Sequence, residues 1–504
     1  MAAIAYTVAF EGIEARMVEV QCAIAPGIPA FAIVGLPNKA VTEARERVRA
    51  ALSALAIALP SKRITINMSP ADLPKIGSHF DLPIAVALLA ALEIIPMDDA
   101  AQTVALGELS LNGDLVSVHG ALPAAMAAAG ENRQLLCPQA CGAEAAWVGD
   151  ARVIAPRSLA DMIRHFNGQS IIPPSQPGEV QHGHSTRDMS EVKGQERAKR
   201  ALEIAAAGRH HLLLVGPPGS GKSMLAARIP GILPPLTPTE ALETSMIHSV
   251  SGLLDAGGIN RERPFREPHH TASMAAIVGG GRGAKPGEIS LAHNGVLFMD
   301  EFPEFPRTVL ETLRQPLETG EVVVARANAH IKYPCKFMLV AAANPCKCGY
   351  LTDAGRACSR APICGEDYMG RISGPLMDRF DLRVEVPPVA FTDLDLPQDG
   401  ESSESIGARV NKARLAQTAR FQGKDHLRVN ADAEGKVLDE IATPDAEGRA
   451  LLTRVAERFG LSARGYHRVL RVARTIADLN GSDGVRHPHI AEAVSYRLAL
   501  SKDD

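Results

Sequence analysis

The sequence has no hydrophobic run long enough to cross a membrane. Its most apolar stretch, 82–92, is interrupted by Pro83, and a spanning helix needs ~20 apolar residues. The first basic residue is Arg16, so the opening MAAIAYTVAF lacks the basic segment with which a secretory signal begins. We therefore expect a cytoplasmic location and no membrane partner.

An excess of charge of one sign is also absent. The chain has 53 Lys and Arg against 57 Asp and Glu, and its formal net charge is −4. This balance excludes a wholly basic surface, but it is compatible with a narrow basic channel that contacts a polyanion. Charge alone therefore neither supports nor excludes nucleic-acid binding.

A chain of 504 residues is too long for one hydrophobic core, so we expect several domains. Residues 1–167 mix strand-like runs with Ala-rich helical stretches, which predicts an α+β domain. Residues 168–188 are rich in Pro, Gly, Gln and His and predict a linker. Residues 189–386 alternate helices and strands, which predicts an α/β domain with a parallel sheet. After a second linker at 387–406, residues 407–504 are predicted to be all helical.

A glycine-rich loop near the start of the second domain predicts nucleotide binding. Residues 216–223 read GPPGSGKS directly after the apolar run HLLLV. Glycines let successive backbone N–H groups point at phosphate oxygens, and the following helix adds its positive N-terminal end. Lys222 offers a cation to the β- and γ-phosphates, and Ser223 offers a hydroxyl to Mg²⁺. The strand-then-helix context argues against the alternative, a chance match.

Polar residues end the next two buried strands. The run GVLFMDE at 295–301 ends in Asp300, which suits the Mg²⁺ shell, and Glu301, which suits orienting an attacking water. A merely solvated strand end is the alternative. The strand at 337–343 is followed by Asn344, whose amide suits γ-phosphate sensing, although Asn before Pro is also common in turns. The predicted nucleotide-binding residues are Gly216, Pro217, Pro218, Gly219, Ser220, Gly221, Lys222, Ser223 and Asp300.

Longer segments of the sequence resemble those of a known family. With the glycine loop they resemble the AAA+ ATPases, and the whole chain is similar to the magnesium-chelatase-like ComM/YifB family. The segments that carry the resemblance are REPHHTAS (266–273), PGEISLAHNGVLFMDE (286–301), ETLRQPLETGEV (311–322), LVAAANPCKCG (339–349), SGPLMDRFDL (373–382) and SARGYHRVLRVARTIADL (462–479).

The resemblance implies an AAA+ P-loop α/β domain with a C-terminal all-α lid, and ATP and Mg²⁺ as cofactors. It assigns Asn344 as sensor 1, Arg379 as the arginine finger for the neighbouring subunit's ATP, and Arg464 as sensor 2. An arginine supplied in trans stabilises charge on the transferred phosphoryl group, so we expect a closed ring, a homo-hexamer. Taken alone, an arginine between two acids, such as Arg379, is more often in a surface ion pair. Whether Arg464 acts on its own ATP or on the neighbour's stays open.

The same resemblance implies DNA as a partner. It predicts a helicase for branch migration of recombination intermediates in natural transformation, with recombination proteins as further partners. The segment 249–287 would line the pore, and 320–334 is predicted to be a β-hairpin that tracks the phosphate backbone. A solvated hairpin with incidental charges is the alternative, because Tyr333 is the one aromatic residue there. The candidate DNA contacts are Arg326, His330 and Lys332.

Four cysteines follow Asn344 with the spacing C-x-C-x₉-C-x₅-C. Four thiolates form a full tetrahedral set for a structural Zn²⁺ and leave no open position for a substrate. C-x-C is less usual than C-x₂-C, so thiols without metal are the alternative. The adjacent His269 and His270 cannot easily converge on one ion and are expected in a structural or pore role. The predicted zinc ligands are Cys346, Cys348, Cys358 and Cys364.

The first domain resembles the Lon-protease fold through segments that include PADLPKIGSHF and GELSLNGDL. Lon-like enzymes use a serine nucleophile with a lysine base, and the matching positions hold His79 and Leu122. Because leucine cannot take a proton, we expect the fold without the peptidase chemistry. Ser78 with Lys75 is a weak alternative dyad.

Three rival functions share parts of this pattern. A chelatase motor for Mg²⁺ insertion into a porphyrin has the ATPase core, but it is not expected to carry the Lon-like domain. An ATP-dependent protease needs the missing serine and lysine. A non-enzymatic assembly platform would tolerate the loss of Glu301 or Arg379, yet both are present. The DNA motor is therefore preferred.

Overall fold

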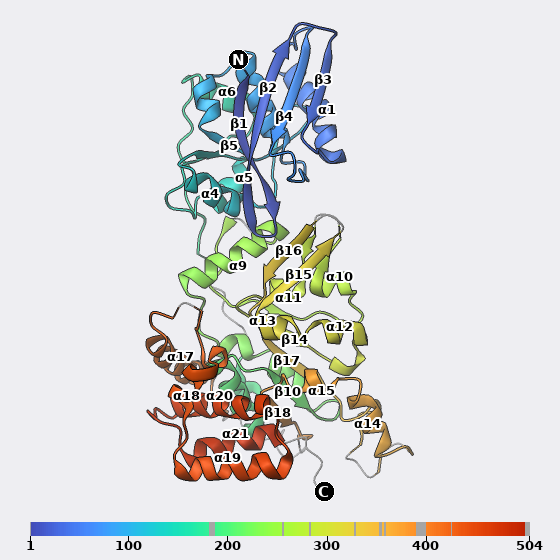
Figure 1. Cartoon of the computed structure of the whole chain (residues 1–504), viewed down its shortest axis with the longest axis vertical. Helices are drawn as coiled ribbons and strands as arrows, with labels where there is room; N and C mark the ends of the chain where they lie inside the picture. The colour runs from blue at the N-terminus through green and yellow to red at the C-terminus, as the bar shows by residue number, and fades with distance from the viewer. Residues whose placement is uncertain are drawn as a thin grey trace.

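The structure is a computed structural model in which three parts are arranged along the long axis (Figure 1). It describes residues 2–180, 187–254, 257–281, 284–326, 329–351, 355–356, 359–389, 400–424 and 426–498. The N-terminal part lies at one end, and the C-terminal helices lie at the other, beside the part that carries the glycine loop. Within the described residues, no helix has both the length and the apolar character needed to cross a membrane.

A seven-stranded mixed sheet forms the N-terminal part, in the order β3-β4-β2-β1-β5-β8-β9. Helix α2 (Asp81–Ala91) is buried almost throughout and fills the core beneath it. The strands are β1 (Ala3–Glu11), β2 (Glu14–Ala25), β3 (Ala30–Val34), β4 (Arg63–Ser69), β5 (Thr103–Ala105), β8 (Gln134–Leu136) and β9 (Val153–Ile154), with a separate pair β6 (Glu108–Leu109) and β7 (Leu115–Val116). The other helices are α1 (Lys39–Ala54), α3 (Met97–Ala101), α4 (Ala121–Gly130), α5 (Gln139–Ala145) and α6 (Leu159–Phe166).

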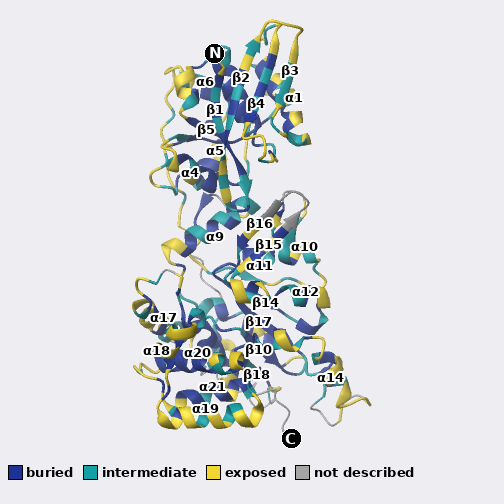
Figure 2. Cartoon of the chain, viewed as in Figure 1, coloured by how far each residue is buried: buried dark blue, intermediate teal, exposed yellow. Residues whose placement is uncertain are grey.

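The middle part is built on a five-stranded parallel sheet, in the order β11-β14-β17-β10-β18. The three central strands are buried and apolar throughout, as is typical of parallel strands covered on both faces (Figure 2). The strands are β10 (Leu212–Val215), β11 (Phe265–Arg266), β14 (Val296–Met299), β17 (Met338–Ala343) and β18 (Leu382–Glu385). Because β17 lies between β10 and β14, the ends of these three strands meet at one edge of the sheet.

Short helices and two hairpins surround this sheet. The hairpins pair β12 (Gly279–Gly280) with β13 (Lys285–Pro286), and β15 (Glu321–Arg326) with β16 (Ala329–Pro334), as the alternation at 320–334 predicts. The helices are α7 (Glu196–Gly208), α8 (Lys222–Ala226), α9 (Pro238–Ser251), α10 (Met274–Val278), α11 (Glu288–Leu291), α12 (Arg307–Thr312), α13 (Pro316–Thr319), α14 (Ile363–Met369) and α15 (Gly374–Met377), with 3₁₀ turns η1 (Met189–Glu191), η2 (Ile229–Ile232) and η4 (Phe302–Glu304).

The described C-terminal residues are all helical apart from turns and loops, as predicted. Helix α17 begins at Ser403, inside the predicted linker, because Ser402 caps it by accepting the Ser405 N–H. Its core is continuous with one face of the parallel sheet, so the helices pack directly on the middle part. The elements are α17 (Ser403–Arg420), η5 (Asn430–Asp432), α18 (Gly435–Ala442), α19 (Ala446–Phe459), α20 (Ala463–Leu479) and α21 (His487–Leu498).

The N-terminal part docks on α9 and on the β15–β16 hairpin (Figure 1). The turn between β1 and β2 lies so close to β16 that a Cβ on Gly12 would come within 2.9 Å of the Ile331 side chain. On the other side, the Trp147 indole N–H donates to the Gly257 carbonyl at 2.8 Å, and the Ser249 hydroxyl donates to the Glu144 carboxylate. The segment 249–287, which was expected to line a pore, and the hairpin at 320–334, which was expected to contact DNA, therefore both contact the N-terminal domain.

Candidate active site

Three predicted site residues converge where β10, β14 and β17 end. Lys222 follows the glycine loop after β10, Asp300 follows β14, and Asn344 follows β17. The Lys222 ammonium lies 3.2 Å from the Asn344 side-chain oxygen. The Ser223 hydroxyl, one residue on, donates to the Asp300 carboxylate. The sheet order therefore brings together residues that lie far apart in the sequence.

The glycine loop has the backbone geometry of a phosphate cradle. Gly219 and Gly221 have φ angles of +76° and +91°, which favour glycine. A Cβ on Gly216 would lie 2.2 Å from the Val386 carbonyl oxygen, so no larger residue fits there. The Lys222 ammonium donates to the Gly216 and Pro217 carbonyls at 2.8 and 2.9 Å. Burial lowers the pKa of Lys222, and the carboxylates of Asp300 and Glu301 oppose that shift.

The residues beside this loop fit a Mg²⁺ ion. The Ser223 hydroxyl and the Asp300 carboxylate share a hydrogen bond, and both are oxygen donors of the type that Mg²⁺ prefers. A second carboxylate, Glu267, follows β11 on the adjacent strand, and burial together with the charge of Asp300 raises its pKa. Sequence analysis missed Glu267, although it stands in the motif REPHHTAS. When bound, the ion would screen the phosphate charge.

The Glu301 carboxylate lies next to a histidine side chain. Glu301 has a φ angle of +50°, and its backbone N–H donates to its neighbour Asp300 at 2.8 Å. The His270 Nδ1 lies 3.2 Å from a Glu301 carboxylate oxygen, and the ring of His269 packs against that of His270 with centroids 4.2 Å apart. The structure thus gives His270 a place at the predicted catalytic carboxylate, which the sequence pattern did not indicate.

Arg379 and Arg464 contact other residues of the same chain. The three guanidinium nitrogens of Arg379 donate to the Arg314 and Pro375 carbonyls and to the Glu318 carboxylate, at 3.0, 2.6 and 2.8 Å. Arg464 also pairs with Glu318, at 3.0 Å. Across the described residues, neither arginine has a hydrogen bond or ion pair with the glycine loop, Asp300 or Glu301.

Two arginines of the helical domain hold the backbone around Arg379. Arg468 donates to the Arg379 carbonyl at 2.9 Å and pairs with Asp381 at 2.5 Å. Arg497 donates to the Phe380 carbonyl at 2.6 Å and pairs with Asp378 at 2.8 Å. Neither anchor could be predicted from the sequence, because nothing in the local pattern reveals a partner about a hundred residues away.

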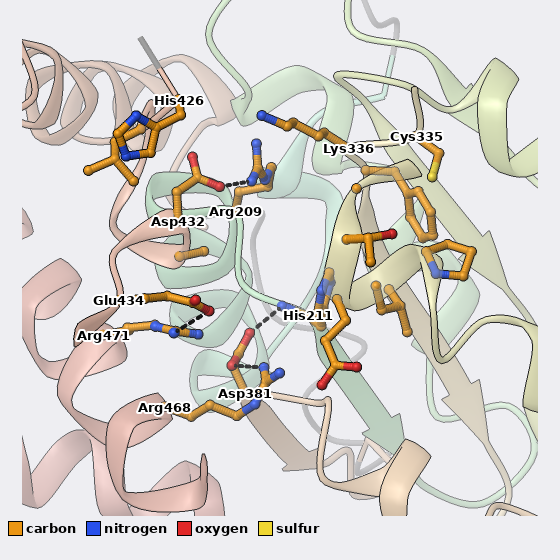
Figure 3. A pocket seen from close by; sticks show the side chains of 18 residues that line it. Arg209, His211, Cys335, Lys336, Asp381, His426, Asp432, Glu434, Arg468 and Arg471 are labelled. Atoms are coloured by element: carbon orange, nitrogen blue, oxygen red, sulfur yellow. Dashed lines mark hydrogen bonds and ion pairs between the residues drawn. The ribbon is translucent and has the colours of Figure 1, made fainter. Parts of the chain in front are cut away.

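A polar pocket at the opposite edge of the sheet does not resemble an anion site (Figure 3). It lies between the ATPase core and the helical domain. The arginines labelled there face acids, and Arg209 pairs with Asp432 and Arg471 with Glu434. Burial lowers the pKa of His211 to about 3, so this histidine is neutral, and its Nδ1 accepts the Leu339 N–H. The pocket therefore belongs to the interface between the two domains.

The hairpin and the cysteine cluster are described only in part. The Lys332 side chain is 71% exposed and lies 3.8 Å from Glu321, whereas the side chains of Arg326 and His330 lie outside the description. Tyr333 is buried and donates to the Ala284 carbonyl at 2.9 Å, so it is not a stacking platform for bases.

Zinc finds no support in the described part of the chain. The sulfurs of Cys346 and Cys348 lie 3.1 Å apart, but the described residues contain no group of three metal ligands. Cys358 lies outside the description, and Cys364 is half-buried. The loop does contact the nucleotide site, because a Cβ on Gly349 would lie 2.4 Å from the ring of Pro218.

The N-terminal domain places no base beside a nucleophile at the Lon-like positions. His79 is buried, its Nε2–H donates to the Val8 carbonyl at 3.0 Å, and burial lowers its pKa to about 4. The Leu122 backbone N–H donates to Glu144 at 3.1 Å. The Lys75 ammonium donates to the Pro70 carbonyl, and burial lowers its pKa. These contacts give Lys75 a structural role and do not support the weak dyad with Ser78.

The glycine loop with Lys222, the Ser223–Asp300 oxygen pair that fits Mg²⁺ and the adjacent Glu301 have the arrangement of a P-loop ATPase site, which defines the class of this protein. Three family models match it, described as magnesium chelatase, subunit ChlI (188–394), subunit ChlI of Mg-chelatase (18–141) and magnesium chelatase, subunit ChlI C-terminal (400–497). The competence protein ComM of Haemophilus influenzae is 44% identical over 99% of this chain and 98% of its own length.

Two further relatives show a higher and a lower degree of similarity. The uncharacterized protein YifB of Escherichia coli is 42% identical over 98% of this chain and 96% of its own length. The magnesium-chelatase 38 kDa subunit of Rhodobacter capsulatus is 26% identical over 61% of this chain and 87% of its own length. The chain belongs to the ComM/YifB family of magnesium-chelatase-like AAA+ ATPases. The predicted family and fold class are thus confirmed, and membership implies ATPase activity with ATP and Mg²⁺.

Proposed function

We propose that the chain is one subunit of a cytoplasmic homo-hexameric ring that hydrolyses ATP to move along DNA. In this proposal the ring promotes branch migration of recombination intermediates during natural transformation, together with recombination proteins. The relative named as a competence protein, which matches nearly the whole chain, supports the biological setting. The proposed ATP hydrolysis is supported by the geometry of the candidate active site.

One observation supports the proposed ring of subunits. Lys222 and Glu301 lie at one edge of the sheet, whereas the described contacts of Arg379 and Arg464 are with Glu318 and include none to that edge. An arginine that neutralises charge on the transferred phosphoryl group accelerates phosphoryl transfer by about 10³ to 10⁵. In the proposal, a neighbouring subunit supplies that arginine. Head-to-tail contacts between subunits either close or grow into a filament, so the proposed assembly is a closed ring.

The contact with DNA rests on the hairpin. Lys332 is exposed on β16, and the neighbouring Arg326 and His330 would add cationic groups, as a strand that follows a phosphate backbone requires. The N-terminal domain packs on the same hairpin through the turn at Gly12. In this proposal it supports the hairpin and has no peptidase activity.

ATPase and strand-exchange assays with and without single-stranded, duplex and branched DNA test the proposal. We expect branched DNA to stimulate hydrolysis, and Glu301→Gln to bind ATP and DNA without turnover, because the water loses its orienting carboxylate. If DNA neither binds nor stimulates hydrolysis and branched substrates stay unchanged, the DNA motor is wrong.

Mixing variants tests the shared site. Arg379→Ala is expected to bind ATP without turnover, and Lys222→Ala to lose ATP binding. A mixed ring contains interfaces in which an intact glycine loop meets an intact Arg379, so mixing should restore part of the hydrolysis. The absence of rescue at every ratio would refute an arginine supplied in trans.

A further inference from the structure

A single carboxylate holds the two arginines that the proposed ring needs at its interface. One oxygen of Glu318 lies 2.8 Å from Nη2 of Arg379, and its other oxygen lies 3.0 Å from Nη2 of Arg464. Glu318 stands on α13 of the ATPase core, whereas Arg464 stands in the first turn of α20 in the helical domain. Glu318 lies in the motif ETLRQPLETGEV, whose pattern predicts no role for this residue.

The three side chains differ in how far water reaches them. The Arg379 side chain is only 7% exposed, Glu318 is 47% exposed and Arg464 is 67% exposed. Transfer of the Glu318 carboxylate to water therefore costs little free energy. A buried guanidinium that is left without an anion costs much more. Arg379 needs an anion at this position at all times, and any replacement for Glu318 must also be anionic.

A triphosphate is such a replacement. Guanidinium groups bind carboxylates and phosphates through the same planar pairs of N–H donors. We propose that Glu318 is a latch that stores Arg379 and Arg464 in the separate subunit and is exchanged for the γ-phosphate of the neighbour's ATP when the ring closes. The inference rests on the proposed ring. It makes Glu318 a positioning residue, which acts through the arginines.

The latch has a measurable consequence, since Glu318 competes with the neighbour's ATP for both arginines. A weaker latch makes closure around ATP easier. Water weakens a charged hydrogen bond that is partly exposed, so removal of the carboxylate charge should lower KM for ATP about three- to tenfold. The kcat at saturating ATP should not fall, because Glu318 has then already left.

Glu318→Gln keeps the shape of the side chain and removes its charge. Glu311→Gln is the matched control, because Glu311 lines the same surface pocket but pairs with Arg314 at 2.9 Å. We expect Glu318→Gln to lower KM and to assemble at lower ATP concentration in analytical ultracentrifugation, and Glu311→Gln to behave as wild type. Glu318→Asp, with a shorter carboxylate, should give an intermediate KM.

The possible results distinguish a failure of the Glu318 latch from a failure of the proposed ring. An unchanged or raised KM in Glu318→Gln, with wild-type thermal stability, overturns the latch, and so does a loss of kcat at unchanged KM. If Glu318→Gln still assembles at a lower ATP concentration when Arg379→Ala and Arg464→Ala are added, the latch is also overturned, since the effect must pass through the arginines. If Arg379→Ala alone retains full turnover, the proposed shared site fails instead.

Discussion

Replacement of Arg468 by methionine would release the loop that carries Arg379. Arg468 is 15% exposed, and its guanidinium pairs with Asp381, which is 4% exposed, at 2.5 Å. The same guanidinium donates to the Arg379 carbonyl at 2.9 Å. Methionine keeps much of the apolar stem, so Arg468→Met removes the charge and the donors with little loss of packing.

The expected cost is large because Asp381 stays buried. Removal of one partner from a buried ion pair costs about 3 to 5 kcal/mol, and the slight exposure of Arg468 favours the lower end. Burial raises the pKa of Asp381, but Arg468 and His210 outweigh that effect and hold its pKa well below the usual range. A depressed carboxyl pKa stabilises the fold above the unfolded value of ~3.9, and this contribution is lost as pH falls through the folded value. The difference between variant and wild type should therefore persist from pH 5 to 8 and shrink below ~3.9.

Hydrogen exchange and ATPase assays measure both effects. Amide exchange across 378–386 and α20 should accelerate by about two orders of magnitude or more, and turnover should fall about 10²-fold, because small displacements of a catalytic group are costly. Nucleotide binding should remain. Arg471→Met is the control, since its partner Glu434 is 79% exposed and such pairs contribute about 0 to 1 kcal/mol. Wild-type exchange and turnover in Arg468→Met would refute the anchor.

Two other substitutions test the cradle and the docked domain. Gly216→Ala places a Cβ 2.2 Å from the Val386 carbonyl, so titration with a fluorescent nucleotide should show at least tenfold weaker binding, and wild-type affinity would contradict the steric argument. Ser249→Ala removes a donor from the half-buried Glu144, whose pKa is already raised by burial, and should weaken domain docking by about 1 to 3 kcal/mol. Emission from Trp147, the chain's one tryptophan, should then shift to the red, and an unchanged spectrum would contradict this role for Ser249.

The glycine loop, Asp300 and Asn344 could be predicted because each lies in a short local motif. The glycine loop must combine glycines with a following lysine within a few residues, and Asp300 and Asn344 must end buried strands. Sequence order also predicted the hairpin at 320–334 and the helical C-terminal domain. These features depend on backbone periodicity and on chemistry between near neighbours.

Other functional contacts could not be predicted. His270 meets Glu301 because β11 lies beside β14 in the sheet. Arg468 and Arg497 reach the loop around Arg379 from helices α20 and α21. A histidine or an arginine on a helix shows no sign of its partner in the sequence, since distant pairs depend on how the elements pack.

The sequence by itself determined that this chain holds a nucleotide, because the backbone and side chains of the cradle are contiguous in the chain. Only the tertiary structure decided where Arg379 and Arg464 rest. Both meet Glu318, a residue from a third segment, and no local pattern encodes that meeting. The physical reason is charge: a mostly buried guanidinium takes an available anion, and packing alone determines which anion is near.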